Sequence, residues 1–484
     1  MLFNSIPFAI FLPVVFVLYW FCVNKNLKIQ NILLLFSSFF FYAYWDYRFL
    51  LLLLFSITLD FVAAKKIHKA KSSKGRKFWF IISIAINLSL LGFFKYYNFF
   101  ISTFSDAAGL VGAPVHPTLL KLVLPVGISF YTFHELSYIV DVFKKRIEPV
   151  DNYVEYALFV TFFPLLVAGP IERATHLLPQ VQKKRFFDYD TAASGMKQIL
   201  WGLFKKIVIA DNCAEIADAI FNNAAGYSGS SHVLGAVFFA IQIYCDFSGY
   251  SDIALGTAKL FGFELLRNFS FPYFSRDIAE FWRRWHISLS SWFRDYLYIP
   301  LGGSKGSNWM KIRNTFIIFL VSGFWHGANW TFVVWGFLNA VYFMPLLIFK
   351  RNRNNMEIVA QGAYFPTFKE VFDIMLTFTL VVFAWIFFRA EDMSHAISYI
   401  SKIFSKSLFT YPHLGGLSFD VSALGILVLL FFVIEWIGRE EKFAIQKLFV
   451  SSPIYIRWAF YLVLIVTIGI WNKDQHQQFI YFHF

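Results

Sequence analysis

The sequence predicts an all-α, multi-pass membrane protein, and three observations carry this prediction. Of its 484 residues, 58% are hydrophobic and only 15% are charged, whereas a soluble globular protein is about half apolar and about one quarter charged. Apolar stretches that approach or reach the ~20 residues needed to cross a bilayer recur throughout the chain. The basic residues gather in short clusters between those stretches, as expected of cytoplasmic loops between membrane helices.

The apolar stretches predict about ten or more membrane spans when shorter candidates are included, at the usual ~20 residues each. The clearest candidates are residues 6–20, 50–64, 78–94, 315–324, 331–349, 371–388, 421–436 and 458–471.

Orientation follows from the basic clusters. The strongest lies in residues 65–77 and is expected to face the cytoplasm, as are the clusters at 144–146, 351–353 and 439–447. Counting outward from these loops places both chain ends outside. The formal net charge of +13 could also indicate nucleic-acid binding, but the confinement of the charge to loops favours membrane topology, and no nucleic-acid partner is expected.

Between about residues 150 and 310, prolines, glycines and charged residues interrupt the apolar runs. Broken backbone at membrane depth is tolerated only where protein or a watery cavity surrounds it. We therefore expect re-entrant and interfacial helices around a central cavity. Because no internal repeat or low-complexity linker is found, a single domain over residues 1–484 is the simplest interpretation.

The segment Glu280–Tyr298 predicts a charged interfacial helix, because its tryptophans and other apolar residues recur at spacings of three and four. His286 lies at the edge of the apolar face of this helix, where it could point inward. An ordinary interfacial histidine is the simpler alternative.

His326 follows the apolar stretch 315–325, with Gly323 one turn earlier and Gly327 directly after it. Glycines at this spacing let another helix or a ligand approach the backbone closely. Ionisable residues within membrane sequence usually serve a function, and a buried neutral imidazole could accept a proton from a hydroxyl as a general base. The alternative is a packing motif whose histidine only bonds a neighbouring helix.

Carboxylates and hydroxyls alternate with apolar residues in the segment 242–252, which suits the polar wall of a cavity. The candidates there are Asp246, Ser248, Tyr250 and Asp252. Structural hydrogen bonding, or pairing with arginines, would explain them equally well.

Several chemistries find no support in the sequence. Cys22, Cys213 and Cys245 have no paired spacing, so neither disulfides nor a metal site is expected. Neither a phosphate loop nor a dinucleotide-binding glycine pattern is found. The letters GGSKG at 302–306 match a nucleophile elbow, but they lie in a basic loop without a preceding strand.

The chain resembles the membrane-bound O-acyltransferases, in particular the bacterial branch that contains alginate O-acetyltransferase and the D-alanyl transfer protein of teichoic acids. The motifs that carry this resemblance are LPVGISFYTF (124–133), LSYIVDVF (136–143), FFPLLVAGPIER (162–173), CDFSGYSDIALG (245–256), the segment NFSFPYFSRDIAEFWRRWHISLSSWFRDYLYIPLGG (268–303) and GFWHGANWTFVVWG (323–336).

The resemblance implies acyl transfer to a hydroxyl, with His326 as the invariant histidine of the family and His286 as its second motif histidine. It also implies a ring of transmembrane helices around a thinned centre, with a catalytic core at about residues 120–345. Trp285, Trp325 and Asn329 of the same motifs are further candidates for the cavity wall or for substrate contacts. His134 departs from the family, in which many members have glutamine.

The tail at residues 479–484, FIYFHF, is similar to a FIYFQF ending of the polysaccharide-acetylating branch. The resemblance makes Tyr481 a candidate acyl relay. An aromatic anchor at the membrane interface explains the tail equally well.

The expected reaction is O-acetylation of a cell-surface or exported polysaccharide, as in alginate, at the bacterial inner membrane. The resemblance implies an acyl thioester as co-substrate, either acetyl-CoA or an acyl carrier protein, with no bound cofactor and no metal. It also implies an outside-facing partner of the SGNH-hydrolase type. The alternatives are D-alanyl transfer to teichoic acids and, from a different class, a proton-coupled transporter that uses the histidines as a relay.

Overall fold

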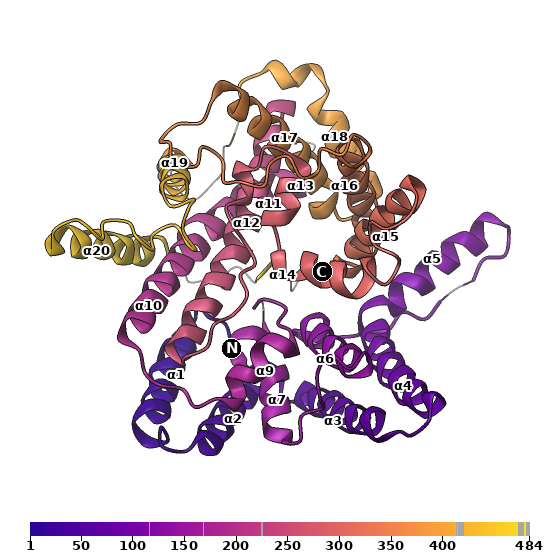
Figure 1. Cartoon of the computed structure of the whole chain (residues 1–484). Helices are drawn as coiled ribbons and strands as arrows, with labels where there is room; N and C mark the ends of the chain where they lie inside the picture. Colours follow the sequence, from indigo (N-terminus) through magenta and orange to yellow (C-terminus); the bar gives the residue numbers. More distant parts are fainter. Residues whose placement is uncertain are drawn as a thin grey trace. The chain divides into compact units, whose positions relative to one another are not determined.

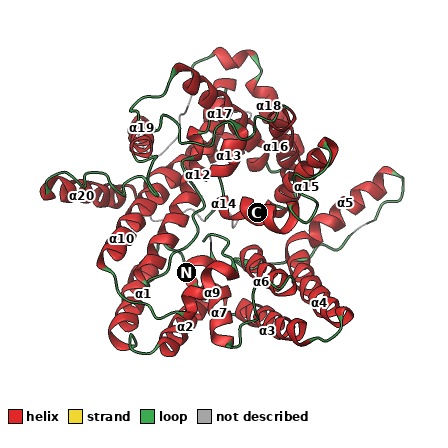
Figure 2. Cartoon of the chain, viewed as in Figure 1, coloured by secondary structure: helices red, strands yellow, loops and turns green. Residues whose placement is uncertain are grey.

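All regular structure in the described part of the chain is helical, which confirms the all-α fold class. The computed structural model describes residues 1–115, 117–167, 169–223, 226–412, 414, 421–472 and 479–480. Within these ranges Figure 2 shows helices and connecting loops without strands.

The helices group into two compact units. Unit 1 comprises Met1–Ala192 and Thr257–Leu266, and unit 2 comprises Ala193–Gly256 and Arg267–Phe484. The predicted single domain and the predicted ring of helices around a thinned centre therefore stay predictions.

Unit 1 holds the helices of the N-terminal part of the chain (Figure 1). They are α1 (Ile6–Val17), α2 (Leu27–Asp46), α3 (Arg48–Lys69), α4 (Ser73–Leu91), α5 (Tyr97–Leu110), α6 (Ile128–Phe143), α7 (Tyr153–Thr161), α8 (Phe163–Leu166), α9 (Ala174–Gln182) and the start of α10 (Tyr189–Leu203).

Helices α3, α4 and α6 pack against one another. Between α3 and α4, the buried carboxylate of Asp60 accepts hydrogen bonds from Ser83 Oγ at 2.5 Å and Asn87 Nδ2 at 2.8 Å. A carboxylate in an apolar bundle needs such donors, since an unbonded charge there would be costly.

Unit 2 contains both histidine motifs. After the end of α10, its helices are α11 (Asp211–Asn222), α12 (Gly229–Leu260, whose last four residues belong to unit 1), α13 (Ile278–Arg284), α14 (Ile287–Phe293), α15 (Asn308–His326), α16 (Trp330–Ile348), α17 (Phe368–Arg389), α18 (Met393–Ile403), α19 (Val421–Ile437) and α20 (Ile454–Trp471).

The described residues contain clear candidates for membrane spans, while the predicted total of about ten or more, which includes shorter candidates, stays a prediction. Six helices in the described residues are long and apolar enough to cross a bilayer, namely Leu27–Asp46, Ser73–Leu110, Gly229–Leu260, Trp330–Ile348, Phe368–Arg389 and Ile454–Trp471, and two shorter apolar helices are Ile6–Cys22 and Val421–Ile437. Helices α3 and α15 are long enough to cross a bilayer, and each contains one of the predicted apolar stretches. The remaining residues of both helices are too polar or charged for the whole helix to count as a clear span. A multi-pass membrane protein is nevertheless confirmed.

Helix α20 exposes most of its apolar side chains, as a helix surrounded by lipid does. Its sequence is apolar on all sides, and Leu464 is its one buried residue. A helix that exposes apolar side chains in every direction is suited to a bilayer and would be insoluble in water.

Candidate active site

Two histidines, His286 and His326, lie close together in the interior of unit 2. Only 1% of His286 and 3% of His326 is exposed, and their ring centroids are 6.5 Å apart. An apolar interior disfavours a charged imidazole and suits a neutral one. The two residues that the sequence singled out from separate motifs are therefore brought into one site.

His286 lies at a break between two short helices. Helix α13 ends at Arg284 and α14 begins at Ile287, and between them His286 has φ +44° and ψ +52°, in the left-handed region. This conformation is uncommon for a residue other than glycine, and such local strain clusters at functional sites. The prediction of one continuous helix over Glu280–Tyr298 is wrong at this point.

The segment that precedes α13 holds the break in place. The Ile287 amide donates to the Asn268 carbonyl at 2.8 Å, and the Ser270 amide donates to the Arg284 carbonyl at 3.0 Å. The Ser288 hydroxyl also bonds the side-chain oxygen of Asn268 at 2.5 Å. These bonds satisfy backbone groups that a continuous helix would pair internally. Helical periodicity gave no sign of them because their partners lie in another segment.

Burial sets the protonation state of His286. It lowers the pKa of the imidazole to about 3, so the ring is neutral near pH 7. The ring lies 4.7 Å from that of Phe247 and 6.2 Å from that of Trp325, between centroids. A neutral imidazole carries one N–H donor and one acceptor nitrogen.

His326 is the last residue of α15, where two glycines let α16 approach. A Cβ atom at Gly323 would overlap the carbonyl oxygen of Phe332, and a Cβ atom at Gly327 would overlap the Phe332 ring. The close approach predicted from these two glycines is therefore confirmed.

Aromatic rings enclose His326. The centroids of Trp325, Trp335 and Phe388 lie 4.8, 5.2 and 5.2 Å from that of the imidazole. Trp325 also contacts His286, so its indole is shared by both histidines. An apolar shell of this kind excludes water and strengthens every polar interaction inside it.

The other two residues suggested by the motifs have clear local surroundings. Trp285 is buried, with its ring 5.1 Å from Trp385 and 5.0 Å from Phe269. Asn329 caps α16, because its side chain accepts from the Thr331 amide at 3.1 Å, a common task of asparagine. A role of either residue in substrate contacts stays a prediction.

The carboxylates of the segment 242–252 lie on α12 and pair with buried lysines. Lys206 Nζ lies 2.7 Å from Asp246 and 2.8 Å from Asp211, and Lys205 Nζ lies 2.5 Å from Asp252. Both lysines belong to a π-helical turn at Phe204–Ala210, a feature frequent at functional sites. The carboxylates are thus paired, but with lysines and not with the arginines that the alternative named, and a catalytic role of Asp246 or Asp252 stays a prediction.

Two of the four polar candidates on α12 line a small cavity. Ser248 and Asp252 face it together with Lys205, Tyr244 and Glu435, and its volume is about 20 Å³. That space suffices for about one water molecule. Asp246 and Tyr250 instead contact the C-terminal tail.

The described part of the tail enters the interior of unit 2. Phe479 and Ile480 are buried, and the Ile480 amide donates to Asp246 Oδ2 at 2.7 Å. The Phe479 ring lies 4.5 Å from Tyr250 and 5.9 Å from Phe247, whose ring contacts His286. The candidate relay Tyr481 lies outside the described residues.

The sequence of the chain also matches a known protein family. The model of the MBOAT family, the membrane-bound O-acyltransferases, matches residues 145–387. The chain belongs to the membrane-bound O-acyltransferase family. The match includes both histidines and the polar residues of α12.

Three relatives show which named proteins this O-acyltransferase is similar to. It is 35% identical over 443 residues to the peptidoglycan O-acetyltransferase of Helicobacter pylori, covering 86% of this chain and 82% of that protein. It is 37% identical over 456 residues to the probable alginate O-acetylase AlgI of Pseudomonas aeruginosa, covering 94% and 84%. The match to the teichoic acid D-alanyltransferase of Bacillus subtilis is weaker, with 26% identity over 295 residues, 58% of this chain and 72% of that protein.

One buried acid of the O-acyltransferase escaped the sequence reasoning. Glu435 of α19 is 2% exposed and accepts hydrogen bonds from Tyr244 Oη at 2.6 Å and Trp201 Nε1 at 3.1 Å. The sequence does contain an indication of this residue, because Glu435 is the single carboxylate in the apolar stretch 421–436, and ionisable residues in such stretches usually serve a function.

In the described part of this O-acyltransferase, no group of three or more histidine, cysteine or acidic side chains could hold a metal ion. The expectation that no metal takes part stays a prediction.

Proposed function

We propose that this O-acyltransferase moves an acetyl group from a cytoplasmic thioester donor to a hydroxyl group of a cell-surface or exported polysaccharide. The observation that carries the proposal is the pair of buried imidazoles, 6.5 Å apart, within the region that matches the family model. Relatives named for O-acetylation of peptidoglycan and of alginate match over more of the chain, and at higher identity, than the D-alanyltransferases do. Acetyl is therefore favoured over D-alanyl.

His326 acts as the general base in this proposal. The acceptor hydroxyl oxygen attacks the thioester carbonyl carbon while its proton passes to an imidazole nitrogen of His326. A C–O bond forms, the tetrahedral intermediate collapses and the C–S bond breaks. The departing thiolate takes up the proton, so the histidine returns to its starting state.

His286 orients the reactants or stabilises the oxyanion. Because its imidazole is neutral, it can donate an N–H hydrogen bond to the negatively charged oxygen of the intermediate. Stabilisation of this kind is usually the largest contribution in acyl transfer.

A proton-coupled transporter would also contain buried histidines. Membership of a family of O-acyltransferases favours transfer over transport. We further propose that the protein lies in the bacterial inner membrane and works with an outside-facing partner of the SGNH-hydrolase type, which completes delivery to the glycan.

The proposal is tested on surface glycans by mass spectrometry. A deletion strain is complemented with the wild-type gene or with His326→Ala, and protein levels in membranes are matched. We expect one ester class to disappear in the deletion and in the variant, with a mass difference that corresponds to acetyl. Unchanged esters in every strain would overturn the proposal, and a D-alanyl mass would identify the alternative donor group.

Tyr481 is proposed as an acyl relay. Its hydroxyl would accept the acetyl group from the thioester with release of the thiol, and the glycan hydroxyl would then displace the tyrosine from the ester. The support is that the preceding residues Phe479 and Ile480 are held beside the wall of the His286 site. Tyr481→Phe should abolish glycan acetylation while Phe484→Tyr does not. Undiminished transfer in Tyr481→Phe would leave the tail with an anchoring role only.

A further inference from the structure

A cavity of unit 1 combines aromatic walls with basic side chains. It has a volume of about 350 Å³ and lies between the end of the first apolar helix, Ile6–Cys22, and the segment that follows α9. Its walls include the aromatic residues Phe16, Trp20 and Phe187 and the basic residues Lys25, Lys184 and Arg185. A volume of this size is sufficient for part of an organic ligand.

Arg185 is held in the wall of this cavity by uncharged partners. Only 6% of the residue is exposed. Its Nε atom donates to the Tyr19 hydroxyl, and its Nη2 atom donates to the side-chain oxygen of Asn31 at 2.6 Å. The Nη1 atom donates to the carbonyls of Gln180 at 3.1 Å and Val181 at 3.2 Å. These bonds orient the guanidinium without neutralising its charge.

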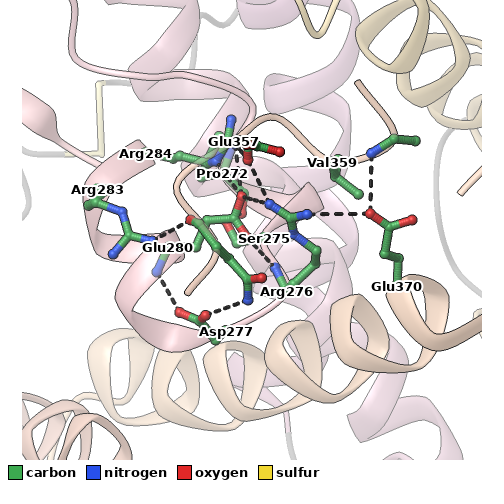
Figure 3. Close-up of polar contacts among 12 residues, drawn as sticks. Pro272, Ser275, Arg276, Asp277, Glu280, Arg283, Arg284, Glu357, Val359 and Glu370 are labelled. Atoms are coloured by element: carbon green, nitrogen blue, oxygen red, sulfur yellow. Dashed lines mark hydrogen bonds and ion pairs between the residues drawn. The ribbon is translucent and has the colours of Figure 1, made fainter. Parts of the chain in front are cut away.

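Two arginines of unit 2 show the more usual way of compensating such a charge. Arg276 and Arg284 both pair with Glu280, at 3.1 and 2.8 Å, so a carboxylate of the protein itself faces their guanidinium groups (Figure 3). Among the described residues, no carboxylate pairs with Arg185. A buried charge without a counter-charge costs free energy. An anionic ligand in the cavity would supply that counter-charge.

Two exposed lysines add positive charge to the same walls. Lys25 follows the first apolar helix, and Lys184 has its ammonium group 5.3 Å from the centre of the Phe186 ring. Neither lysine forms an ion pair with a carboxylate of the described residues. Asp188, the acid closest in sequence to Lys184, does not line the cavity and accepts a hydrogen bond from the Thr191 amide at 2.8 Å. The cavity therefore carries a positive charge that favours an anion.

The surroundings of the cavity are those of a membrane surface. The topology predicted from the basic clusters places the end of the helix Ile6–Cys22, with Lys25 and Lys28, on the cytoplasmic side. Phe21 and Phe186 also line the cavity, and 74% and 72% of these residues are exposed. Exposed aromatic rings beside lysines are typical of the boundary between acyl chains and headgroups. A ligand with both an anionic head and an apolar chain matches this combination.

We propose that this cavity binds an anionic phospholipid of the cytoplasmic leaflet. Lys25 and Lys184 donate charge-assisted hydrogen bonds to the headgroup phosphate, and Arg185 adds its positive charge from the wall. An acyl chain packs on the rings of Phe16 and Trp20. Basic pockets on the cytoplasmic side of a membrane protein recognise anionic headgroups in this way. The inference goes beyond the proposed function, because it concerns neither the acyl donor nor the acceptor.

The test measures lipid binding to the purified full-length protein in detergent by native mass spectrometry, which needs no acyl transfer. The probes are phosphatidylglycerol, phosphatidylcholine with the same acyl chains, and glycerol phosphate, which has the phosphate without the chains. The test variant combines Lys25→Gln with Lys184→Gln. The matched control combines Lys28→Gln with Lys183→Gln, which removes two exposed charges at nearby positions outside the cavity. Unchanged melting temperatures without added lipid confirm folding.

The wild-type protein should bind the first phosphatidylglycerol about tenfold or more tightly than phosphatidylcholine, the scale expected for two basic residues beside an anionic headgroup. The test variant should lose most of this preference and the matched control should keep it. Equal affinity for the two lipids, an undiminished preference in the test variant, or the same loss in both double variants would overturn the inference. Glycerol phosphate that binds as tightly as phosphatidylglycerol would also overturn it, because the acyl chains would then contribute nothing.

Discussion

At the scale of single residues, the sequence singled out two histidines that the structure places close together, but it did not reveal all their surroundings. His286 and His326 were recognisable because ionisable groups are rare in apolar sequence. The partners of Asp246 and Asp252 were not recognisable, because the lysines lie in a π-helical turn that leaves no periodic mark. Whether a buried carboxylate is paired depends on side chains from distant segments of the chain. A single sequence does not show which of these side chains lie close together in space.

The protonation of His286 leads to a prediction on stability against pH. Its pKa is about 3 in the folded protein and about 6.5 in an unfolded chain, so the unfolded chain takes up the proton first. This contribution to stability is complete above pH 6.5 and is lost as the pH falls toward 3, by about 1.4 kcal/mol per pH unit.

The measurement compares melting temperatures of wild type and His286→Asn between pH 8 and pH 5, since asparagine tolerates the left-handed backbone. The wild type should lose more stability below pH 6.5 than the variant does, and the two should show the same pH dependence between pH 7 and pH 8. Parallel curves over the whole range would contradict a neutral buried imidazole at this position.

At the scale of elements, the predicted helices agree with the structure where the apolar periodicity is continuous. The prediction was wrong where contacts with another segment break the helix. A close approach by a helix or a ligand was foreseen at Gly323 and Gly327, and in the structure α16 makes it. The segment Glu280–Tyr298 was expected to be one helix but breaks at His286. The break follows from hydrogen bonds to residues 268–270. Because these residues lie outside the segment, its apolar periodicity could not indicate the break.

The packing of α15 on α16 gives a matched pair of glycine substitutions. Gly323→Ala should lower stability by about 1–3 kcal/mol, because its Cβ would overlap the Phe332 carbonyl and the helices would have to separate. Gly425→Ala in α19, with nothing within 4 Å of its Cβ, should be neutral or slightly stabilising. Thermal unfolding in detergent measures both. Equal effects of the two substitutions would contradict the close packing.

At the scale of the whole molecule, composition and charge clusters were enough to predict a helical multi-pass membrane protein. Among the described residues, six helices have the length and composition of a span and two further apolar helices are shorter, so the predicted total of about ten or more spans stays a prediction. The buried position of Phe479 and Ile480 was not predictable from the residues alone, since an aromatic tail also suits a membrane interface. Family membership and the pair of buried histidines together support the proposed O-acetyltransferase.

The most direct test of this account is the rate of acetyl transfer by the purified protein from a thioester donor to a soluble oligosaccharide, measured by mass spectrometry in a single turnover. For His326→Ala, the account predicts a rate reduced by at least ~10²-fold, the lower end for loss of a general base, with unchanged melting temperature. Transfer by the folded variant at the wild-type rate would contradict the role of His326 as the base.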